Sequence, residues 1–498
     1  MPHLNVPFRR TPAVIIMALA FLIVPGAPAT LSTPSVEAEV AGISLAFQRG
    51  ELDFALEEPT SLAFGPDGRL YVTSRTEIWA LTLDPATQTL LASEQVASGL
   101  EGVLGIAFDP TAPASPVIFY VSRQELSHTP GYQGVVSSFT GPTWQRQEVI
   151  TGLPSSEPHL NHLTNGLAFD DGGRLFIAQG SNTDAGVPGA VGMGPFWPET
   201  PLSAAILVAD IHDPGFDGAI TYSPAGSPED DAVIQTGGFG VAVYAPGHRN
   251  PYDLVIHSNG YIYSTDNGAL GFGTSLSCTL TGGLTSTADE LNLVEEGNYY
   301  GFPNRNRGLG LPDARQCVYH PPEEIAGPAD DFTGPIAVLP NHCSCDGLVE
   351  YTADAFGGAL TGALVYVSLI QGTVSRAALS QDGRDVDSIS ELASGFDWPL
   401  DVTAGPGGTL YVAEFAGDQI SYLAPDSDGD GCADGRELGP NEVLGGQRDP
   451  ANPWDFYDVN GDRIVNIVDD VLAVAAAFGP ETAPNYNEAL DRSPASPG

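Results

Sequence analysis

Short apolar stretches, each followed by a glycine-containing turn and a second apolar stretch, recur along most of the chain. The clearest copies read SLAFGPDGRLYV (61–72), GLAFDDGGRLFI (166–177), DLVIHSNGYIY (253–263) and DVTAGPGGTLYV (401–412). Weaker copies lie at 104–121 and 362–376. Each copy predicts two β-strands joined by a turn in which glycine adopts a positive φ angle. The pattern therefore predicts six repeated β-units.

A single hairpin cannot bury its apolar face alone, so a periodic series predicts units that pack against one another. A ring of four-stranded sheets achieves this with few exposed strand edges. We therefore predict an all-β protein with a six-bladed β-propeller over residues 40–424, in preference to a series of β-sandwiches. Residues 178–240 and 267–360 interrupt the pattern. We expect them to form long loops that cover one face, where a propeller would build a site.

The pattern changes abruptly after the last repeat, where acidic loops replace apolar strands. One loop places oxygen ligands at positions 1, 3, 5, 9 and 12 and a backbone carbonyl at position 7, the spacing that wraps one calcium ion. Its ligands would be Asp458, Asn460, Asp462, Ile464, Asn466 and Asp469. An apolar helix is expected over 471–478. This loop resembles those of dockerins, and a solvated acidic turn is the alternative interpretation.

Another acidic loop lies before it in the chain and resembles a thrombospondin type 3 or EF-hand-like repeat. Its ligands at the same positions would be Asp426, Asp428, Asp430, Cys432, Asp434 and Glu437. We predict a small calcium-binding α module over residues 425–480, followed by a disordered tail over 481–498. The two loops differ from each other, unlike those of a dockerin, so a cohesin-like or cell-wall partner for the module stays open.

The first residues have the composition of an export signal. Arg9 and Arg10 precede an apolar run over 13–24, and the small residues of 25–29 offer a cleavage site. We predict a signal peptide over 1–29, with an uncleaved membrane anchor as the alternative. The mature chain would then be secreted, periplasmic or bound at the cell surface, with no membrane span.

Charge and composition exclude several functions. The chain has 62 acidic and 18 basic residues, a net charge of −44, and every basic residue is an arginine. Such a field repels nucleic acids and anionic membranes. Without lysine there is neither a Schiff-base nor a P-loop lysine. The five cysteines are Cys278, Cys317, Cys343, Cys345 and Cys432. In an exported protein the first four are expected to form disulfides whose pairing stays open, leaving one thiol.

Three short patterns in the repeat region carry candidate chemistry. The first is Asn161-His162-Leu163-Thr164-Asn165, directly before a repeat. The second is Gly247-His248-Arg249-Asn250-Pro251, where an arginine near the propeller axis would pair with an anion or a developing negative charge. The third is Asp289-Glu290-Leu291-Asn292, followed by Tyr300-Gly301-Phe302-Pro303.

These patterns, in this order, resemble the soluble quinoprotein glucose/sorbosone dehydrogenase family over about residues 50–420. The segment EGVLGIAFDP (101–110) is also similar to a strand of that family. The resemblance implies a six-bladed propeller that binds pyrroloquinoline quinone (PQQ) and calcium on one face. It further implies oxidation of a sugar at its anomeric carbon, followed by electron transfer to an external acceptor.

The resemblance also implies individual roles. The general base of the family falls on His162, with Asn161 at the place of the acidic residue beside it. Arg249 matches the arginine that polarises the quinone carbonyl, and Asn250 matches its cofactor-contacting neighbour. Glu101 falls where a sugar-contacting glutamine often lies. The quinone-bound calcium would use main-chain oxygens near Asn267 and Gly268.

The sequence departs from the family where quinone carboxylates need cationic partners. Ile370, Gln371, Trp398 and Leu400 lie where lysine or arginine is expected. An exported PQQ-dependent aldose dehydrogenase is the leading hypothesis. Two alternatives stay open: a non-catalytic extracellular propeller used for binding, and a calcium-dependent hydrolase of the lactonase kind.

Overall fold

The computed structural model describes residues 35–40, 43–155, 162–183, 199–223, 234–268, 272–274, 280–282, 288–302, 333–440, 445–455, 458–459, 465–477 and 484. The predicted signal peptide and Asn161 lie outside these residues, as do Cys278 and Cys317. So do Asn460, Asp462 and Ile464 of the loop that begins at Asp458, and nearly all of the predicted tail. All described residues belong to the compact unit Thr33–Gly498. Among the described helices, none has the length and hydropathy needed to cross a membrane.

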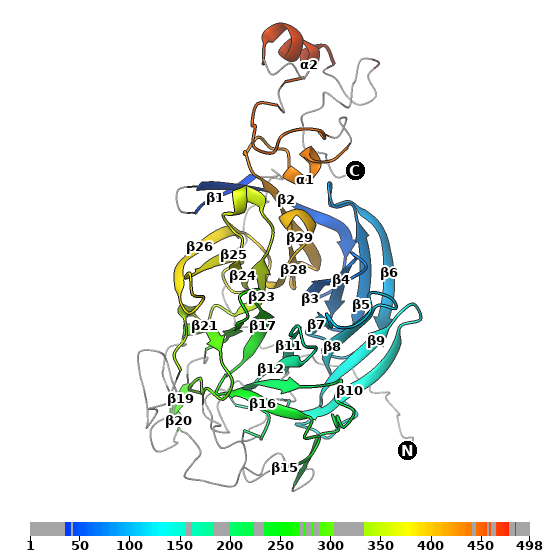
Figure 1. The fold of residues 1–498 in the computed structure, drawn as a ribbon, viewed down its shortest axis with the longest axis vertical. Helices are drawn as coiled ribbons and strands as arrows, with labels where there is room; N and C mark the ends of the chain where they lie inside the picture. The colour runs from blue at the N-terminus through cyan, green and yellow to red at the C-terminus, as the bar shows by residue number, and fades with distance from the viewer. Residues whose placement is uncertain are drawn as a thin grey trace, which may run out of the picture. The chain divides into compact units, whose positions relative to one another are not determined.

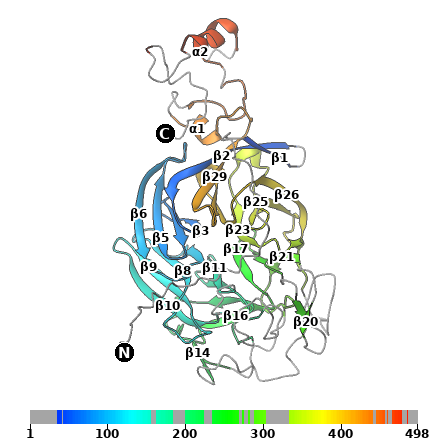
Figure 2. The same ribbon diagram turned by 180° about the vertical axis from the view of Figure 1, so that it is seen from behind.

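Six antiparallel sheets are arranged around a common centre, which confirms the predicted all-β six-bladed propeller (Figure 1). Their innermost strands contact one another in the order β3, β7, β11, β17, β23, β27 and back to β3, so the ring is closed. In such a ring each sheet covers a face of its neighbour, so the unpaired strand edges lie at the centre and at the periphery. Figure 2 shows the outer strands β6, β10 and β26 at the periphery.

The first three blades each contain four strands, named from the centre outward. Blade one is β3 (Pro59–Phe64), β4 (Leu70–Ser74), β5 (Glu77–Leu83) and β6 (Leu90–Ser98). Blade two is β7 (Gly105–Phe108), β8 (Ile118–Gln124), β9 (Gly134–Thr140) and β10 (Gln145–Leu153). Blade three is β11 (Thr164–Phe169), β12 (Leu175–Gln179), β13 (Ala205–Ala209) and β16 (Val241–Pro246).

The last three blades have the same order from the centre. Blade four is β17 (Pro251–Ile256), β18 (Ile262–Asp266), β21 (Ala288–Val294) and β22 (Ala337–Asn341). Blade five is β23 (Cys345–Tyr351), β24 (Ala363–Ser368), β25 (Thr373–Leu379) and β26 (Val386–Ser394). Blade six is β27 (Pro399–Ala404), β28 (Leu410–Glu414), β29 (Gln419–Asp426) and β2 (Ile43–Ala55), with β1 (Ser35–Val40) at its edge.

Blade six closes the ring because it contains strands from both the beginning and the end of the repeat region. Strand β2 comes from the beginning of the chain and pairs with β29, from Ala46 opposite Asp426 to Ala55 opposite Gln419. The strands of the ring thus extend from residue 43 to residue 426. Opening this pairing would expose two strand edges and the apolar cluster beneath them.

The remaining elements are short. Two additional hairpins are β14 (Thr221–Ser223) with β15 (Ile234–Gly237), and β19 (Phe272–Thr274) with β20 (Leu280–Gly282). Two 3-10 turns, η2 (Ala355–Gly358) and η3 (Pro406–Gly408), lie in blades five and six. The C-terminal region contains α1 (Asp434–Glu437), the π-helical turn η5 (Ile467–Val471) and α2 (Leu472–Ala477). The predicted helix over 471–478 corresponds to α2, and the calcium module itself stays a prediction.

Aspartates and glycines alternate where the innermost strands meet. Asp401 of β27 accepts hydrogen bonds from the Leu62 N–H (2.7 Å) and the Ser61 hydroxyl (2.8 Å) of blade one. Asp253 of β17 likewise accepts from the Leu348 N–H of blade five (2.9 Å). These strands surround a cavity of 150 Å³ on the axis. The two carboxylates therefore link blades through bonds that lie outside the sheets.

Close approach at the axis requires residues without a Cβ atom. At Gly166 a Cβ would lie 2.2 Å from Asp253 Oδ1, and at Gly347 a Cβ would lie 2.3 Å from Asp401 Oδ1. Both distances are shorter than any van der Waals contact, so glycine at these positions is a packing requirement.

The structure corrects one of the six predicted repeats. Five of them are the first two strands of a blade, as in β3–β4 and β11–β12. Residues 362–376 instead contain β24 and β25, the second and third strands of blade five. The innermost strand of that blade is β23, and the connection from β23 to β24 contains η2. No Asp-Gly turn joins these two strands, so they do not show the repeated phrase.

The two predicted loop regions also contain blade strands. Residues 178–240 include β13, and residues 267–360 include β21, β22 and β23. The expectation that these regions are only loops is therefore wrong. Strands β13, β21 and β23 are mostly buried, but none of them is joined to a neighbouring strand by the short glycine turn that marks the repeated phrase.

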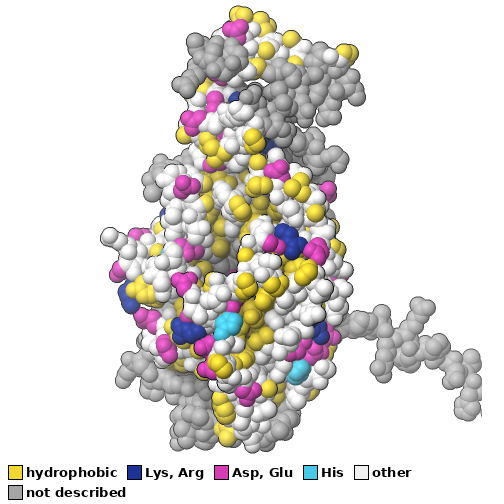
Figure 3. Space-filling model, turned by 45° about the vertical axis from the view of Figure 1, so that its right-hand side comes forward, with side chains coloured by type: hydrophobic (Ala, Val, Ile, Leu, Met, Phe, Trp, Pro, Cys, Tyr) yellow, Lys and Arg dark blue, Asp and Glu magenta, His cyan; other side chains and the backbone are white. Residues whose placement is uncertain are grey.

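On the face in Figure 3, acidic side chains are scattered rather than gathered in one patch. Among the described cysteines, Cys343 and Cys345 form a disulfide with each other. Cys432 is buried as a thiol.

Candidate functional site

One face of the ring collects the predicted site residues. It is formed by the N-terminal ends of the innermost strands and the turns between the second and third strands of each blade, and we call it the site face. Backbone bonds join these segments: the Ser181 N–H donates to the Arg249 carbonyl (2.8 Å), and the Ile370 N–H donates to the Cys343 carbonyl (3.1 Å). The structure therefore places His162, Arg249 and His342 at the starts of blades three, four and five.

His162 is held in one tautomer by Ser181. The imidazole is 4% exposed, and its Nδ1 lies 2.8 Å from the Ser181 hydroxyl. That hydroxyl donates its own proton to the Thr183 carbonyl (2.6 Å). The serine oxygen can therefore only accept from the ring, which places the imidazole proton on Nδ1 and the lone pair on Nε2.

The surroundings of His162 keep it neutral. Burial lowers its pKa well below the usual value, and the nearby charges of Arg249 and His342 lower it further. A neutral imidazole with its lone pair on Nε2 is the form that can accept a proton.

Arg249 and Asn250 are fixed by a carboxylate at the end of the neighbouring strand. The Arg249 N–H donates to Asp266 Oδ2 (3.0 Å), and the Asn250 N–H donates to Asp266 Oδ1 (2.7 Å). The Arg249 guanidinium donates through Nη1 to the Asn267 carbonyl (3.0 Å) and is 5% exposed as a residue. The Asn250 side-chain oxygen accepts from Asn165 (2.9 Å). The arginine is thus a buried cation with a fixed direction.

The predicted calcium position at Asn267 and Gly268 lies beside His342. His342 donates from Nδ1 to the Gly268 carbonyl (3.0 Å), and the Asn267 amide donates to Asp346 Oδ1 (2.9 Å). The side-chain oxygen of Asn267 is buried and has no hydrogen-bond partner among the described atoms. This orphaned oxygen and two main-chain carbonyls are donors of the type that calcium prefers.

Two buried carboxylates support this corner of the site. Asp289 accepts from the Gly268 N–H (2.8 Å) and the Cys345 N–H (3.0 Å), so it joins blade four to the disulfide-containing segment. Burial raises the pKa of Asp289 to about 8 and that of Asp346 to about 7. The third sequence pattern, which begins at Asp289, thus has a structural role at the site.

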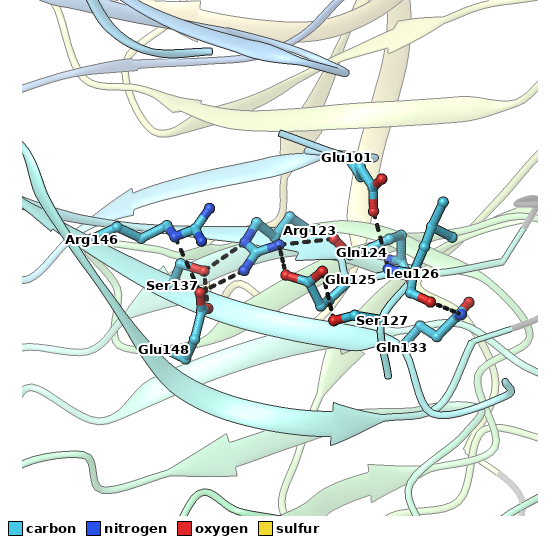
Figure 4. A network of polar contacts seen from close by, with 10 residues as sticks. All are labelled: Glu101, Arg123, Gln124, Glu125, Leu126, Ser127, Gln133, Ser137, Arg146 and Glu148. Carbon is cyan, nitrogen blue, oxygen red and sulfur yellow. Dashed lines mark hydrogen bonds and ion pairs between the residues drawn. The ribbon is translucent and has the colours of Figure 1, made fainter. Parts of the chain in front are cut away.

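Glu101 lies on the site face in blade two (Figure 4). One of its carboxylate oxygens accepts from the Leu126 N–H (3.0 Å), which holds the turn between β8 and β9. Below it, Arg123 is almost fully buried and bonded to Glu148 (2.6 Å) and Glu125 (3.1 Å). Glu101 is itself exposed and reaches solvent on the site face.

The four positions where basic residues were expected carry uncharged side chains. Ile370 is 61% exposed and Trp398 is 47% exposed, both on the site face, whereas Leu400 is buried in the ring. Gln371 is exposed in the turn between β24 and β25. These four side chains offer no cation to an anionic ligand.

Several predicted ligands of the C-terminal loops, among the described residues, make contacts within the protein. Asp434 accepts from the Ser427 N–H (2.6 Å) and hydroxyl (2.5 Å), so its carboxylate serves the loop backbone. In the other loop Asp469 is exposed, and its neighbour Asp470 is buried and accepts from the Val459 and Asn466 N–H groups. Asn466 caps η5, and Asp458 is buried.

Sequence reasoning missed Ser181 and His342 at the site. Neither lies in a pattern that predicts chemistry, and the fold brings both into the surroundings of His162. The register of the β11–β12 hairpin could have indicated Ser181. Thr164 pairs with Gln179, His162 lies two residues before Thr164, and Ser181 lies two residues after Gln179.

Comparisons with known proteins agree with this architecture. The profile of the family "Glucose / Sorbosone dehydrogenase" matches residues 56–420. Quinoprotein glucose dehydrogenase B of Acinetobacter calcoaceticus is 24% identical over 278 residues, which cover 50% of this chain and 51% of that protein. The match thus spans about half the length of that relative. An uncharacterised Synechocystis protein is 22% identical over 375 residues, covering 72% of this chain and 81% of that protein.

Solved structures show the same fold at low identity. The soluble aldose sugar dehydrogenase of Escherichia coli has a TM-score of 0.52 and 19% identity, covering 76% of this chain and 99% of that one. The PQQ domain of pyranose dehydrogenase from Coprinopsis cinerea has a TM-score of 0.54 and 15% identity, covering 80% and 98%. Because the family profile spans well over half of the sequence, this chain belongs to the glucose/sorbosone dehydrogenase family.

Proposed function

We propose that this protein is a quinone-dependent dehydrogenase that oxidises a sugar at its anomeric carbon, with His162 as the general base. The observation that carries the proposal is the buried neutral imidazole of His162, oriented by Ser181 and next to the buried cation of Arg249. A base and a fixed cation on one face of a propeller suit the removal of a hydroxyl proton beside an electron acceptor.

The proton chemistry follows from the tautomer. His162 would accept the C1 hydroxyl proton on Nε2, while its Nδ1 proton stays with Ser181. The imidazolium so formed lies near Arg249 and His342, which favour rapid loss of its proton. The quinone supplies the acceptor for the hydride that leaves C1. Arg249 would stabilise negative charge that develops on an acceptor oxygen.

The described residues could hold one end of a quinone, the end that carries an anionic oxygen. Arg249 and His342 are the groups that would hold an anionic oxygen, and Asn267 with the Gly268 carbonyl would supply oxygen ligands to calcium. Ile370 and Trp398 would contribute apolar contacts where cations were expected. We therefore expect weaker cofactor binding than a site with several cations would give, and a stronger dependence on Arg249 and calcium.

The lactonase alternative is less well supported. A calcium-centred hydrolase needs carboxylates that converge on one ion at the axis. In this protein both oxygens of Asp266 accept backbone N–H bonds, and the oxygens of Asp346 accept from Asn267 and Ser344. These carboxylates serve the protein scaffold.

The test is reconstitution of the purified protein with PQQ and calcium, followed by dye reduction with a panel of aldoses. Quinone binding is measured separately by absorbance titration. His162→Ala should abolish dye reduction and leave the quinone dissociation constant within about threefold, because the base acts on the sugar hydroxyl. Arg249→Ala should weaken quinone binding.

His212→Ala is the matched control, because His212 lies on the opposite face, paired with Asp109 (2.6 Å). It should retain activity. Failure of the wild-type protein to bind the quinone would contradict the proposal and favour a non-catalytic propeller. Dye reduction that persists in His162→Ala would remove His162 from its assigned role.

A further inference from the structure

A second group of buried and half-buried acidic side chains lies far from the site face, where the chain leaves the propeller. It consists of Asp426, Asp428, Asp430, Glu437 and Asp455, and we call it the carboxylate cluster. Asp426 ends β29, Glu437 ends α1, and Asp455 comes from the segment after residue 445. Asp455 was not among the predicted ligands, because it lies outside the twelve-residue loop.

Each aspartate of the cluster uses one oxygen for the protein and leaves the other unbonded. One oxygen of Asp426, Asp428, Asp430 and Asp455 accepts a backbone N–H, from Gly431 (3.0 Å), Asp430 (3.1 Å), Cys432 (2.7 Å) and Asp449 (2.7 Å) respectively. The second oxygen of each is buried without a hydrogen-bond partner among the described atoms. Backbone bonds thus orient four carboxylates inward.

Glu437 supplies the independent evidence that a ligand belongs to this cluster. Its side chain is fully buried, at 0% exposure, and both carboxylate oxygens lack a hydrogen-bond partner in the described structure. A buried carboxylate with no partner is strongly destabilising, so folded proteins avoid it unless a cation compensates.

The distances correspond to those around a single ion. Oxygens of Asp426, Asp428 and Asp430 lie within 4.8 Å of one another, and so do those of Asp430, Glu437 and Asp455. Two calcium–oxygen bonds of about 2.4 Å span about 4.8 Å. Asp430 belongs to both groups, so the two groups adjoin at this residue.

We propose that the carboxylate cluster binds one calcium ion and that this ion fastens the segment around Asp455 to the closing blade of the propeller. The six unbonded oxygens match the six to eight oxygen ligands of calcium, with Glu437 bidentate. Magnesium requires a smaller octahedral site that retains waters. The ligand set differs from the predicted one, since Asp455 takes part and Asp434 does not.

The site is joined to the ring closure by direct contacts. Asp426 pairs with Ala46 of β2, and the Gln48 side chain of β2 donates to the Gly431 carbonyl inside the loop. Ser427, next to Asp426, accepts from the Phe356 N–H of blade five (3.1 Å). An ion bound by Asp426 therefore stabilises the strand pair that holds the first and last parts of the ring together.

The test uses the full chain stripped with a chelator and titrated with calcium by calorimetry, together with thermal unfolding with and without the ion. Glu437→Gln and Asp455→Asn are compared with Asp449→Asn. Asp449 is an exposed carboxylate of the same segment, and its side chain bonds only Ala451 among the described residues. Other calcium sites contribute equally to all three variants, so the readout is the difference from the control.

Both cluster variants should lose one equivalent of bound calcium, or bind it on the order of 100-fold more weakly, and lose the rise of Tm on calcium addition. Without calcium the Tm of each cluster variant should equal or exceed that of the control, because the substitution removes one carboxylate that repels the other carboxylates of the cluster. Equal calcium binding in all three variants would overturn the proposal. Normal binding in Asp455→Asn alone would overturn the part assigned to Asp455.

Discussion

Asp401 offers the sharpest test of how the ring is held together. Its carboxylate belongs to blade six but accepts the Leu62 N–H (2.7 Å) and the Ser61 hydroxyl (2.8 Å) of blade one. Burial raises its pKa to about 7, and the charge of Asp401 raises the pKa of the neighbouring Asp253 further above its usual value. The protonated form of Asp401 is therefore favoured in the folded protein relative to the unfolded chain.

The direction of the pH effect follows from this raised pKa. In the unfolded chain Asp401 titrates near pH ~3.9, and in the folded protein it titrates near pH 7. The stability that its protonated form contributes is present below about pH 4 and is lost as the pH rises to about 7. Three pH units at about 1.4 kcal/mol each amount to about 4 kcal/mol.

Asp401→Asn separates the charge from the hydrogen bonds. The amide oxygen can still accept from Leu62 and Ser61, whereas the Val402 N–H loses its acceptor, and the side chain no longer ionises. The variant should be more stable than the wild type by up to about 4 kcal/mol near pH 8 and of similar or lower stability near pH 4. The free energy of unfolding is measured by urea denaturation at both pH values.

The control is Asp387→Asn, since Asp387 is an exposed side chain of β26. It should change stability by less than about 0.5 kcal/mol at either pH. If Asp401→Asn destabilises the protein equally at both pH values, the carboxylate is ionised and favourable in the fold, and the reasoning fails.

Two further predictions concern the site and the axis. Ser181→Ala should lower kcat about tenfold and move the acidic limb of the kcat–pH profile to lower pH, because the Ser181 contact raises the pKa of His162; an unchanged profile would contradict this role. Gly166→Ala should destabilise the protein by about 1–3 kcal/mol in urea unfolding, because its Cβ would lie 2.2 Å from Asp253 Oδ1. Gly172→Ala, whose Cβ would meet only the Asp170 side chain at 3.3 Å, should stay within about 0.5 kcal/mol of the wild type.

The sequence reveals the inner half of each blade better than the outer half. The first two strands are buried and usually joined by a tight turn, so they leave a repeated phrase such as that of β3 and β4. An outer strand such as β6 is mostly exposed and has no fixed apolar alternation. Blade five is the exception among the inner halves, since η2 replaces the turn between β23 and β24. Six units were therefore predictable, whereas the strand order within blade five was not.

The site itself follows partly from hairpin geometry. The first two strands of a blade run antiparallel, so the residue two positions before the first strand faces the residue two positions after the second. This relation joins His162 to Ser181, and the same geometry brings Arg249 close to Asp266 and Asn267. It could have been applied to the sequence once a hairpin was recognised.

Asp455 obeys no such rule, because it reaches the carboxylate cluster from a segment that pairs with no strand. A twelve-residue loop can be read from spacing only when every ligand comes from that loop. When a ligand comes from elsewhere, one predicted position of the loop is not needed for the ion. Asp434 holds such a position in the proposed site, since its carboxylate accepts hydrogen bonds from Ser427 instead. In the proposed calcium site, local spacing identifies the loop, while the tertiary fold decides which carboxylates complete it.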